Sequence, residues 1–189
     1  METDHSDSGV SGEADSPSRP GDSTPWKIII ADDEHEVHNI TRMVMREYTF
    51  EGKGVTFLSS YTAEETMALL RDNPDTALIL LDVVMESDDA GLDVVRYIRN
   101  DLHNNIIQII LRTGQAGQAP EQEVVERYEI NDYKTKYEFT AQKLYTIITS
   151  SLRAFRLNNS INRLNTQLRE ELRERKENEE KIRALSQFQ

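Results

Sequence analysis

The chain has 189 residues, of which 37% are hydrophobic, which is enough for one ordinary domain with a buried core and shorter appendages. Its formal net charge of -12 disfavours binding to nucleic-acid phosphates or anionic lipid surfaces, whereas a divalent cation is a natural small partner. There is no cysteine, no secretory signal and no apolar stretch near ~20 residues, so we expect a cytoplasmic protein without disulfides, zinc-thiolate sites or membrane insertion.

Residues 1–25 are rich in Ser, Asp, Gly and Pro and offer almost nothing for a core to bury. Ordering such a segment costs backbone entropy without compensating burial, so we expect a disordered tail. A regular pattern of strands and helices begins at Trp26 with the strand "WKIIIA". The helix that follows is predicted to bury one face, formed by Val37, Ile40, Val44 and Tyr48.

Further strands and helices alternate along the chain. "VTFLSS" is a strand, and "TAEE" at 62–65 fits a capping box that begins a helix. "TALILLD" is a third strand, followed by the acidic loop "MESDDAG" and a helix with Leu92, Val95 and Ile98 on one side. "IIQIIL" is the fourth strand, Pro120 suits the first turn of a fourth helix, and "INDYKTK" contains a short fifth strand. The alternation predicts an α/β fold with a five-stranded, parallel, doubly wound sheet.

Polar side chains stand at the carboxyl ends of these strands. Asp32 and Asp33 follow the first strand, Asp82 ends the third, Thr113 follows the fourth and Lys136 the fifth. Loops converge at this edge of an open parallel sheet, so we expect these side chains to meet there. Two carboxylates about 4 Å apart at an effective dielectric of about 20 repel by roughly 4 kcal/mol, so the acidic trio needs a cation. Oxygen ligands without His or Cys indicate Mg²⁺, which suits phosphoryl transfer to Asp82.

Four motifs, "IIIADDE", "LILLDVVM", "LRTG" and "NDYKTK", occur in the order seen in receiver domains of two-component response regulators. The chain resembles that family from about Trp26 to Leu157, which implies a CheY-like (flavodoxin-like) fold. The resemblance implies that a histidine kinase or phosphotransfer protein donates a phosphoryl group from phosphohistidine. It gives the roles of phosphoacceptor to Asp82, acidic metal-binding pair to Asp32 and Asp33, metal-binding backbone carbonyl to Val84, switch hydroxyl to Thr113, switch aromatic to Tyr133 and phosphate-binding lysine to Lys136.

The chain departs from the family pattern at three places. Tyr137 follows Lys136 where the family usually has a cis proline, so we expect a trans peptide bond there. Val84 and Gln115 stand where the family tunes attack of water on the acyl phosphate, and the Val84 side chain cannot orient water, so we expect slow intrinsic dephosphorylation. The acidic loop "MESDDAG" lacks the family's common proline, and its extra carboxylates are expected to modulate metal affinity or kinase docking.

Two histidines lie near the acidic pair. His35 and His38 are spaced to share a helix face close to Asp33. A transition-metal site is compatible with that spacing, but solvated histidines on a helix are much commoner, and we expect solvated side chains here.

The C-terminal part of the chain predicts one long helix, because Thr140 to Gln189 contains neither Gly nor Pro. At 1.5 Å per residue it would be roughly 70 Å long, and isolated helices of that length need a partner. A heptad seam is formed by Ile161, Leu164 and Leu168, Leu172 falls out of register, and Ile182 and Leu185 resume the seam. We favour a parallel two-stranded coiled coil over a solvated single helix.

The predicted organisation is a tail (1–25), a receiver domain (26–157) and a coiled-coil signalling helix (158–189), with a homodimer formed through the fourth, fifth and C-terminal helices. We expect a phosphoacceptor module of a phosphorelay and not an enzyme, because the chain has no kinase, ATP-binding or cyclase motif. A longer parent protein with a histidine kinase or cyclic-di-nucleotide domain would place the enzyme elsewhere. The alternatives are a non-phosphorylated scaffold and, less favoured by the adjacent acids in "ADDEH", a phosphoaspartyl hydrolase.

Overall fold

A computed structural model describes residues 24–114, 130–135 and 140–186. Five parallel strands form one sheet in the order β2-β1-β3-β4-β5, which confirms the predicted topology. The strands are β1 (Trp26–Ala31), β2 (Val55–Ser60), β3 (Leu78–Asp82), β4 (Gln108–Thr113) and β5 (Asp132–Thr135). The strand order reverses between β1 and β3, and in open α/β sheets that switch point is where ligands bind beyond the strand ends.

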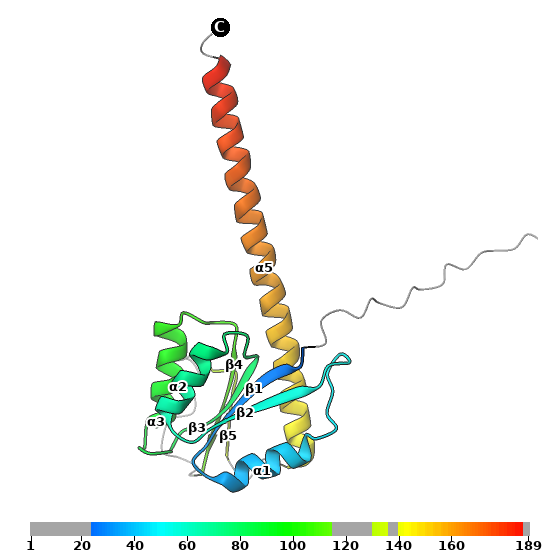
Figure 1. Cartoon of the computed structure of the whole chain (residues 1–189), viewed down its shortest axis with the longest axis vertical. Helices are drawn as coiled ribbons and strands as arrows, with labels where there is room; N and C mark the ends of the chain where they lie inside the picture. The colour runs from blue at the N-terminus through cyan, green and yellow to red at the C-terminus, as the bar shows by residue number, and fades with distance from the viewer. Residues whose placement is uncertain (1–23, 115–129, 136–139, 187–189) are drawn as a thin grey trace, which may run out of the picture.

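Helices cover both faces of the sheet (Figure 1). α1 (His35–Val44) and α5 (Ala141–Ser186) lie on one face, and α2 (Ala63–Asp72) and α3 (Ala90–Arg96) lie on the other. A π-helical segment, Tyr97–Asp101, continues α3. The helix predicted to begin near Pro120 lies outside the described residues.

The alternation of apolar side chains along each strand builds the two halves of the core. Ile28 and Ile30 of β1 pack on the side of α1 and α5, while Ile29 and Ala31 pack on the side of α2 and α3. All four side chains are fully buried. Burying an isoleucine side chain contributes about 1.5–3 kcal/mol, so these strands have little freedom to shift register. The fixed register holds the carboxyl ends of the strands in place.

The buried face of α1 differs from the predicted one. His38 and Thr41 are buried, as are Met45 and Tyr48 just beyond the helix, whereas Ile40 is 48% exposed. Of the predicted face of Val37, Ile40, Val44 and Tyr48, Tyr48 is buried and Val37 and Val44 are partly buried, so the prediction was wrong for Ile40. The helix turns a histidine inward because hydrogen bonds satisfy both ring nitrogens of His38.

α2 begins where the capping box predicted. The Thr62 hydroxyl accepts a hydrogen bond from the Glu65 backbone N–H at 3.2 Å, and the Glu65 carboxylate accepts one from the Tyr61 N–H at 2.8 Å. The first bond satisfies one of the backbone donors that a helix leaves unpaired at its start, and the second ties the first turn to the residue before the N-cap.

α5 is a single helix of 46 residues, roughly 70 Å long, as predicted. Its first part packs on the sheet through Leu144, Ile148, Leu152 and Phe155 and is fixed by a 2.8 Å hydrogen bond between the Tyr48 and Thr149 hydroxyls. From residue 156 to residue 183 every side chain is exposed, and the helix projects from the domain (Figure 1). None of the described helices combines the length and apolar character that a membrane span requires.

Candidate functional site

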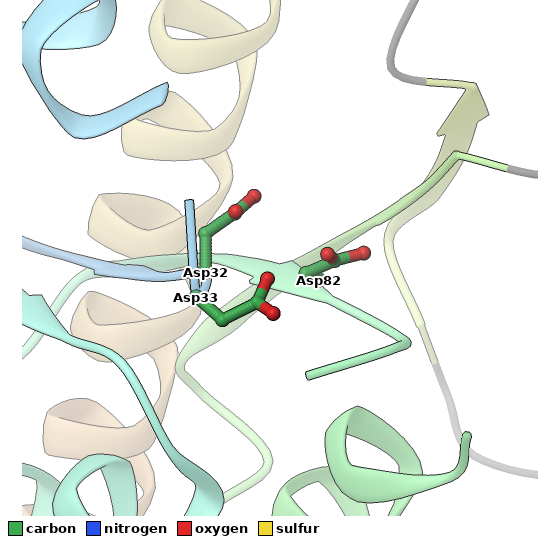
Figure 2. Close-up of side chains that lie close together, drawn as sticks. All are labelled: Asp32, Asp33 and Asp82. Atoms are coloured by element: carbon green, nitrogen blue, oxygen red, sulfur yellow. The ribbon is translucent and has the colours of Figure 1, made fainter. Parts of the chain in front are cut away.

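Three aspartates meet at the switch point of the sheet. β1 and β3 are neighbours with Ala31 opposite Leu81, so Asp32 and Asp33 emerge beside Asp82 (Figure 2). One carboxylate oxygen from each of the three lies within 4.8 Å of the others. The sheet thus brings together the acidic residues that the sequence predicts to meet.

The burial of these carboxylates makes their closeness electrostatically costly. Asp32 and Asp82 are buried, and Asp33 is exposed. Carboxylates this close, in surroundings less polar than water, repel strongly unless cations neutralise them. Hard carboxylate oxygens, some buried and one open to solvent, fit the ligand preference of Mg²⁺, which keeps part of its coordination shell for water or phosphate.

One cation is built into this site. Arg112 of β4 lies opposite Asp82 of β3, and its Nη2 donates a hydrogen bond to Asp32 Oδ2 at 2.7 Å. Burial lowers the pKa of Arg112, while Asp32, Asp82 and Glu34 raise it, and a guanidinium stays protonated in proteins. Sequence reasoning missed this residue. Its signal was a lone basic residue in the mostly apolar run "IIQIILRT".

His38 supports the same aspartate from the other side. Its Nε2 lies 2.7 Å from the Asp32 backbone oxygen, and its Nδ1 lies 2.8 Å from the Ser59 hydroxyl, which also accepts a bond from Arg42 Nη2. His38 is buried, so the expectation of a solvated side chain was wrong for this residue, although His35 is exposed. Its imidazole is a structural partner of the Asp32 backbone.

The loop after Asp82 is fixed by close backbone packing. Gly91, in the first turn of α3, donates its N–H to the Val83 carbonyl at 3.0 Å. A Cβ atom at this position would lie only 2.1 Å from the Asp82 carbonyl oxygen. Glycine is therefore required for α3 to approach the backbone of Asp82.

A carboxylate of the acidic loop is used for helix capping. Glu86 Oε1 accepts a hydrogen bond from the Ala63 N–H, at the first residue of α2, at 2.8 Å. A negative charge at a helix N-terminus is stabilising. The described contact of Glu86 thus joins the loop to α2, and the expected role of the loop's carboxylates in metal affinity or kinase docking stays a prediction.

The remaining predicted residues are placed only in part. Thr113 ends β4, one residue beyond the Asp82–Arg112 pair, and Tyr133 lies in β5 opposite Leu111. Val84 follows β3 in the loop and is partly buried. Lys136, Tyr137 and Gln115 lie outside the described residues.

Comparison with known proteins gives one relative of assigned function. No family model matches the chain. It is 46% identical, over 132 residues, to the 3'3'-cGAMP-specific phosphodiesterase 2 of Vibrio cholerae. The match covers 70% of this chain but 25% of the relative, so the chain spans about a quarter of the length of that protein.

Solved structures with the same fold are receiver domains. A CheY-like response regulator receiver domain protein from Methanospirillum hungatei has a TM-score of 0.56 at 21% identity, over 71% of this chain and 99% of its own. The signal receiver domain of an HD domain-containing protein from Pseudomonas fluorescens has a TM-score of 0.60 at 15% identity, over 72% of this chain and 93% of its own. With its β2-β1-β3-β4-β5 parallel sheet, the chain has the fold of CheY-like response regulator receiver domains.

Proposed function

We propose that this chain is a phosphorylatable receiver domain of a two-component system, and that Asp82 accepts the phosphoryl group from a phosphohistidine of a histidine kinase or phosphotransfer protein. The observation that carries the proposal is the position of Asp82, at the end of a buried strand with oxygens of Asp32 and Asp33 within 4.8 Å. Burying a carboxylate is costly unless a cation compensates its charge, and a metal ion bound by Asp32 and Asp33 would both compensate Asp82 and bring phosphate to it.

The proposed reaction is an in-line displacement at phosphorus. A carboxylate oxygen of Asp82 forms the new P–O bond while the P–N bond to the donor imidazole breaks, and the electron pair of that bond stays on nitrogen. The products are an acyl phosphate on Asp82 and a neutral imidazole on the donor after proton exchange with solvent.

Mg²⁺ would be held by Asp32, Asp33, Asp82 and the Val84 carbonyl, and it supplies neutralisation of charge on the transferring oxygens. Lys136 is proposed to bind a phosphoryl oxygen. Asp82 must be ionised to attack, and the neighbouring guanidinium of Arg112 favours its ionised form.

The readout is proposed to pass through Thr113, Tyr133 and the surface of the fourth and fifth helices. An acyl phosphate adds about -1.5 to -2 charge and strong acceptors, which would draw in the Thr113 hydroxyl and let Tyr133 reorient. Residues 158–189 are proposed to form a parallel coiled coil in a homodimer. Ile161, Leu164 and Leu168 support this, since each is more than half exposed in the single chain.

The chain is further proposed to be the regulatory part of a longer signalling protein. The relative from Vibrio cholerae is a phosphodiesterase about four times the matched length, and one structural neighbour belongs to an HD domain-containing protein. The receiver would end near Leu157, which agrees with Phe155 being the last buried residue among those described in α5. In this proposal the chain carries the signal and a separate domain carries any enzyme activity.

Phosphorylation by a small donor tests the proposal. The full chain is incubated with Mg²⁺ and acetyl phosphate, and intact-mass spectrometry detects one added phosphoryl group. We expect the label in the wild type and in Asp75→Asn, a control just before β3, at the amino-terminal ends of the strands. We expect no label in Asp82→Asn or in the presence of EDTA. Label on Asp82→Asn would refute the assignment of the phosphoacceptor.

The same assay distinguishes the other functions. Continuous hydrolysis of acetyl phosphate without accumulated label would indicate a phosphoaspartyl hydrolase. No label and no turnover would indicate the scaffold.

A further inference from the structure

The contact between Arg112 and Asp32 is unusual for its place in the fold. Arg112 lies near the end of β4, where the preceding residues Ile109, Ile110 and Leu111 are buried and apolar, and its own side chain is 4% exposed. Its Nη2 lies 2.7 Å from Asp32 Oδ2. Burying a guanidinium costs several kcal/mol unless a close carboxylate and hydrogen bonds compensate, so the position needs its partner.

Hydrogen bonds hold both the carboxylate and the backbone of Asp32. Its carboxylate accepts two hydrogen bonds, at Oδ1 from the Glu34 backbone N–H at 3.0 Å and at Oδ2 from Arg112. Its backbone carbonyl accepts a hydrogen bond from His38, and its backbone N–H donates one to the Ser60 carbonyl at 3.2 Å. The described bonds therefore fix both the carboxylate and the backbone of Asp32.

The guanidinium also acts on the other carboxylates of the site. Strand register places Arg112 directly opposite Asp82, and the carboxylates of Asp82 and Glu34 attract its charge. Without the exposed Glu34, the carboxylates of Asp32, Asp33 and Asp82 and the one guanidinium leave two negative charges among these described residues. A single divalent ion would balance them.

We propose that Arg112 is the resident counter-ion of the acidic pocket: by binding Asp32 it keeps the metal-free pocket stable and lowers the pocket's affinity for divalent cations. This rests on the proposed function only in taking the Asp32, Asp33 and Asp82 cluster as a cation site. Without the guanidinium, the described residues of the pocket would carry three negative charges instead of two, and a divalent cation would have to supply more of the neutralisation.

Divalent cation binding to the full chain tests the inference. Mn²⁺ and Mg²⁺ affinities are measured by isothermal titration calorimetry for the wild type, Arg112→Gln, Arg112→Lys and Arg156→Gln. The last variant removes the same positive charge from the ion pair between Arg156 and Glu51. Glu51 precedes β2, so this pair lies at the amino-terminal end of that strand, away from the acidic cluster.

Each variant has its own expected result. We expect Arg112→Gln to bind Mn²⁺ roughly tenfold more tightly, Arg112→Lys to stay within about twofold of the wild type, and Arg156→Gln to bind as the wild type does. Equal or weaker binding by Arg112→Gln would overturn the inference. An equal gain in affinity in Arg112→Lys would also overturn it, because the positive charge would then be irrelevant. The inference would fail as well if neither the wild type nor Arg112→Gln bound a divalent cation.

Thermal unfolding tests the inference even if Arg112→Gln folds poorly without metal. By linkage, the rise in Tm between EDTA and saturating Mn²⁺ should be larger for Arg112→Gln than for the wild type. If Arg112→Gln is unfolded in EDTA, the inference requires Mn²⁺ to restore a cooperative transition. Failure of the metal to restore folding would show that Arg112 is only a packing element.

The outcome is separable from that of the proposed function. Wild-type labelling by acetyl phosphate with no change in metal affinity in Arg112→Gln would remove the inference alone. No labelling of the wild type, with the predicted order of metal affinities, would remove phosphorylation alone.

Discussion

His38 Nε2 lies 2.7 Å from the backbone carbonyl oxygen of Asp32, the residue whose carboxylate joins the acidic cluster. A carbonyl oxygen only accepts hydrogen bonds, so Nε2 carries the proton. In the neutral ring Nδ1 then accepts from the Ser59 hydroxyl, whose oxygen accepts in turn from Arg42. The donors and acceptors are matched for neutral imidazole, and protonation of Nδ1 would change the bond to Ser59 while the Nε2–H bond to the Asp32 carbonyl stays.

This arrangement predicts a pH-dependent stability. Burial lowers the pKa of His38 below its ordinary value of 6.5, outweighing the contributions of Asp32 that raise it. The unfolded chain therefore binds a proton at His38 more readily than the folded chain does, so the free energy of unfolding falls as the pH drops through about 6.5. Urea unfolding in EDTA between pH 5.5 and 8 should show this slope. In His38→Gln it should be reduced, and an unchanged slope would contradict the assignment.

A methyl group at position 91 should disturb the backbone of Asp82 directly. The added Cβ of Gly91→Ala would lie 2.1 Å from the Asp82 carbonyl oxygen, so α3 or the end of β3 must move. We expect a loss of about 3 kcal/mol in the free energy of unfolding and reduced labelling of Asp82. Gly54→Ala is the matched control, because a Cβ there meets nothing within 4 Å. Equal stabilities of the two variants in urea would count against the close packing.

The exposed seam of α5 should determine the oligomeric state. Leu164 lies nine residues after the buried Phe155, about two and a half turns, and so on the face turned away from the sheet. Leu164→Asp with Leu168→Asp is expected to convert a dimer to a monomer in sedimentation equilibrium. Asn162→Asp with Thr166→Asp adds the same charge to the other face and should leave the dimer intact. A monomeric wild type would refute the coiled coil.

The orientation of the helices in that dimer can be determined by cross-linking. The chain has no cysteine, so Leu164→Cys introduces a single thiol at the seam. In a parallel, in-register coiled coil the two thiols face each other, and mild oxidation should give a disulfide-linked dimer. Cross-linking through Asn162→Cys with equal efficiency would argue against the assigned face.

Dephosphorylation of labelled Asp82 is expected to be slow. The Val84 side chain has no group that could orient an attacking water. After removal of donor, the mass-spectrometric label should persist for much longer than seconds, and Val84→Asn should shorten its lifetime. A wild-type half-life of seconds would contradict the interpretation of Val84.

The main features of the fold were predictable because they depend on local patterns. "LILLD" is apolar until its last residue, and a strand buried on both faces tolerates a carboxylate only at an end. Once Asp82 and the Asp32–Asp33 pair were placed at the ends of parallel strands, the shared edge followed from topology. Thr62 and Glu65 likewise predicted the start of α2 because a capping box is contained in four residues.

The errors concern pairings between distant residues. Asp32 and Arg112 are 80 positions apart, and only the register of β3 and β4 brings the arginine to the acidic cluster. The inward turn of His38 depends in the same way on Ser59 of β2, so helical periodicity alone favoured Ile40 instead. The capping of α2 by Glu86 was also missed, because its partner, the Ala63 backbone, has no signature in the loop sequence.

The unbroken backbone of α5 has a torsional consequence. Between Phe155 and Ser186 there is neither glycine nor proline, the residues at which helices most often kink, so the orientation of the distal end is set by the part of α5 that packs on the sheet. Each residue added to or removed from the shaft would turn its distal end by about 100° and shift it by about 1.5 Å. The number of residues in α5 therefore sets the rotation of its distal end relative to the sheet, and insertions or deletions of single residues would change that rotation in steps of about 100°.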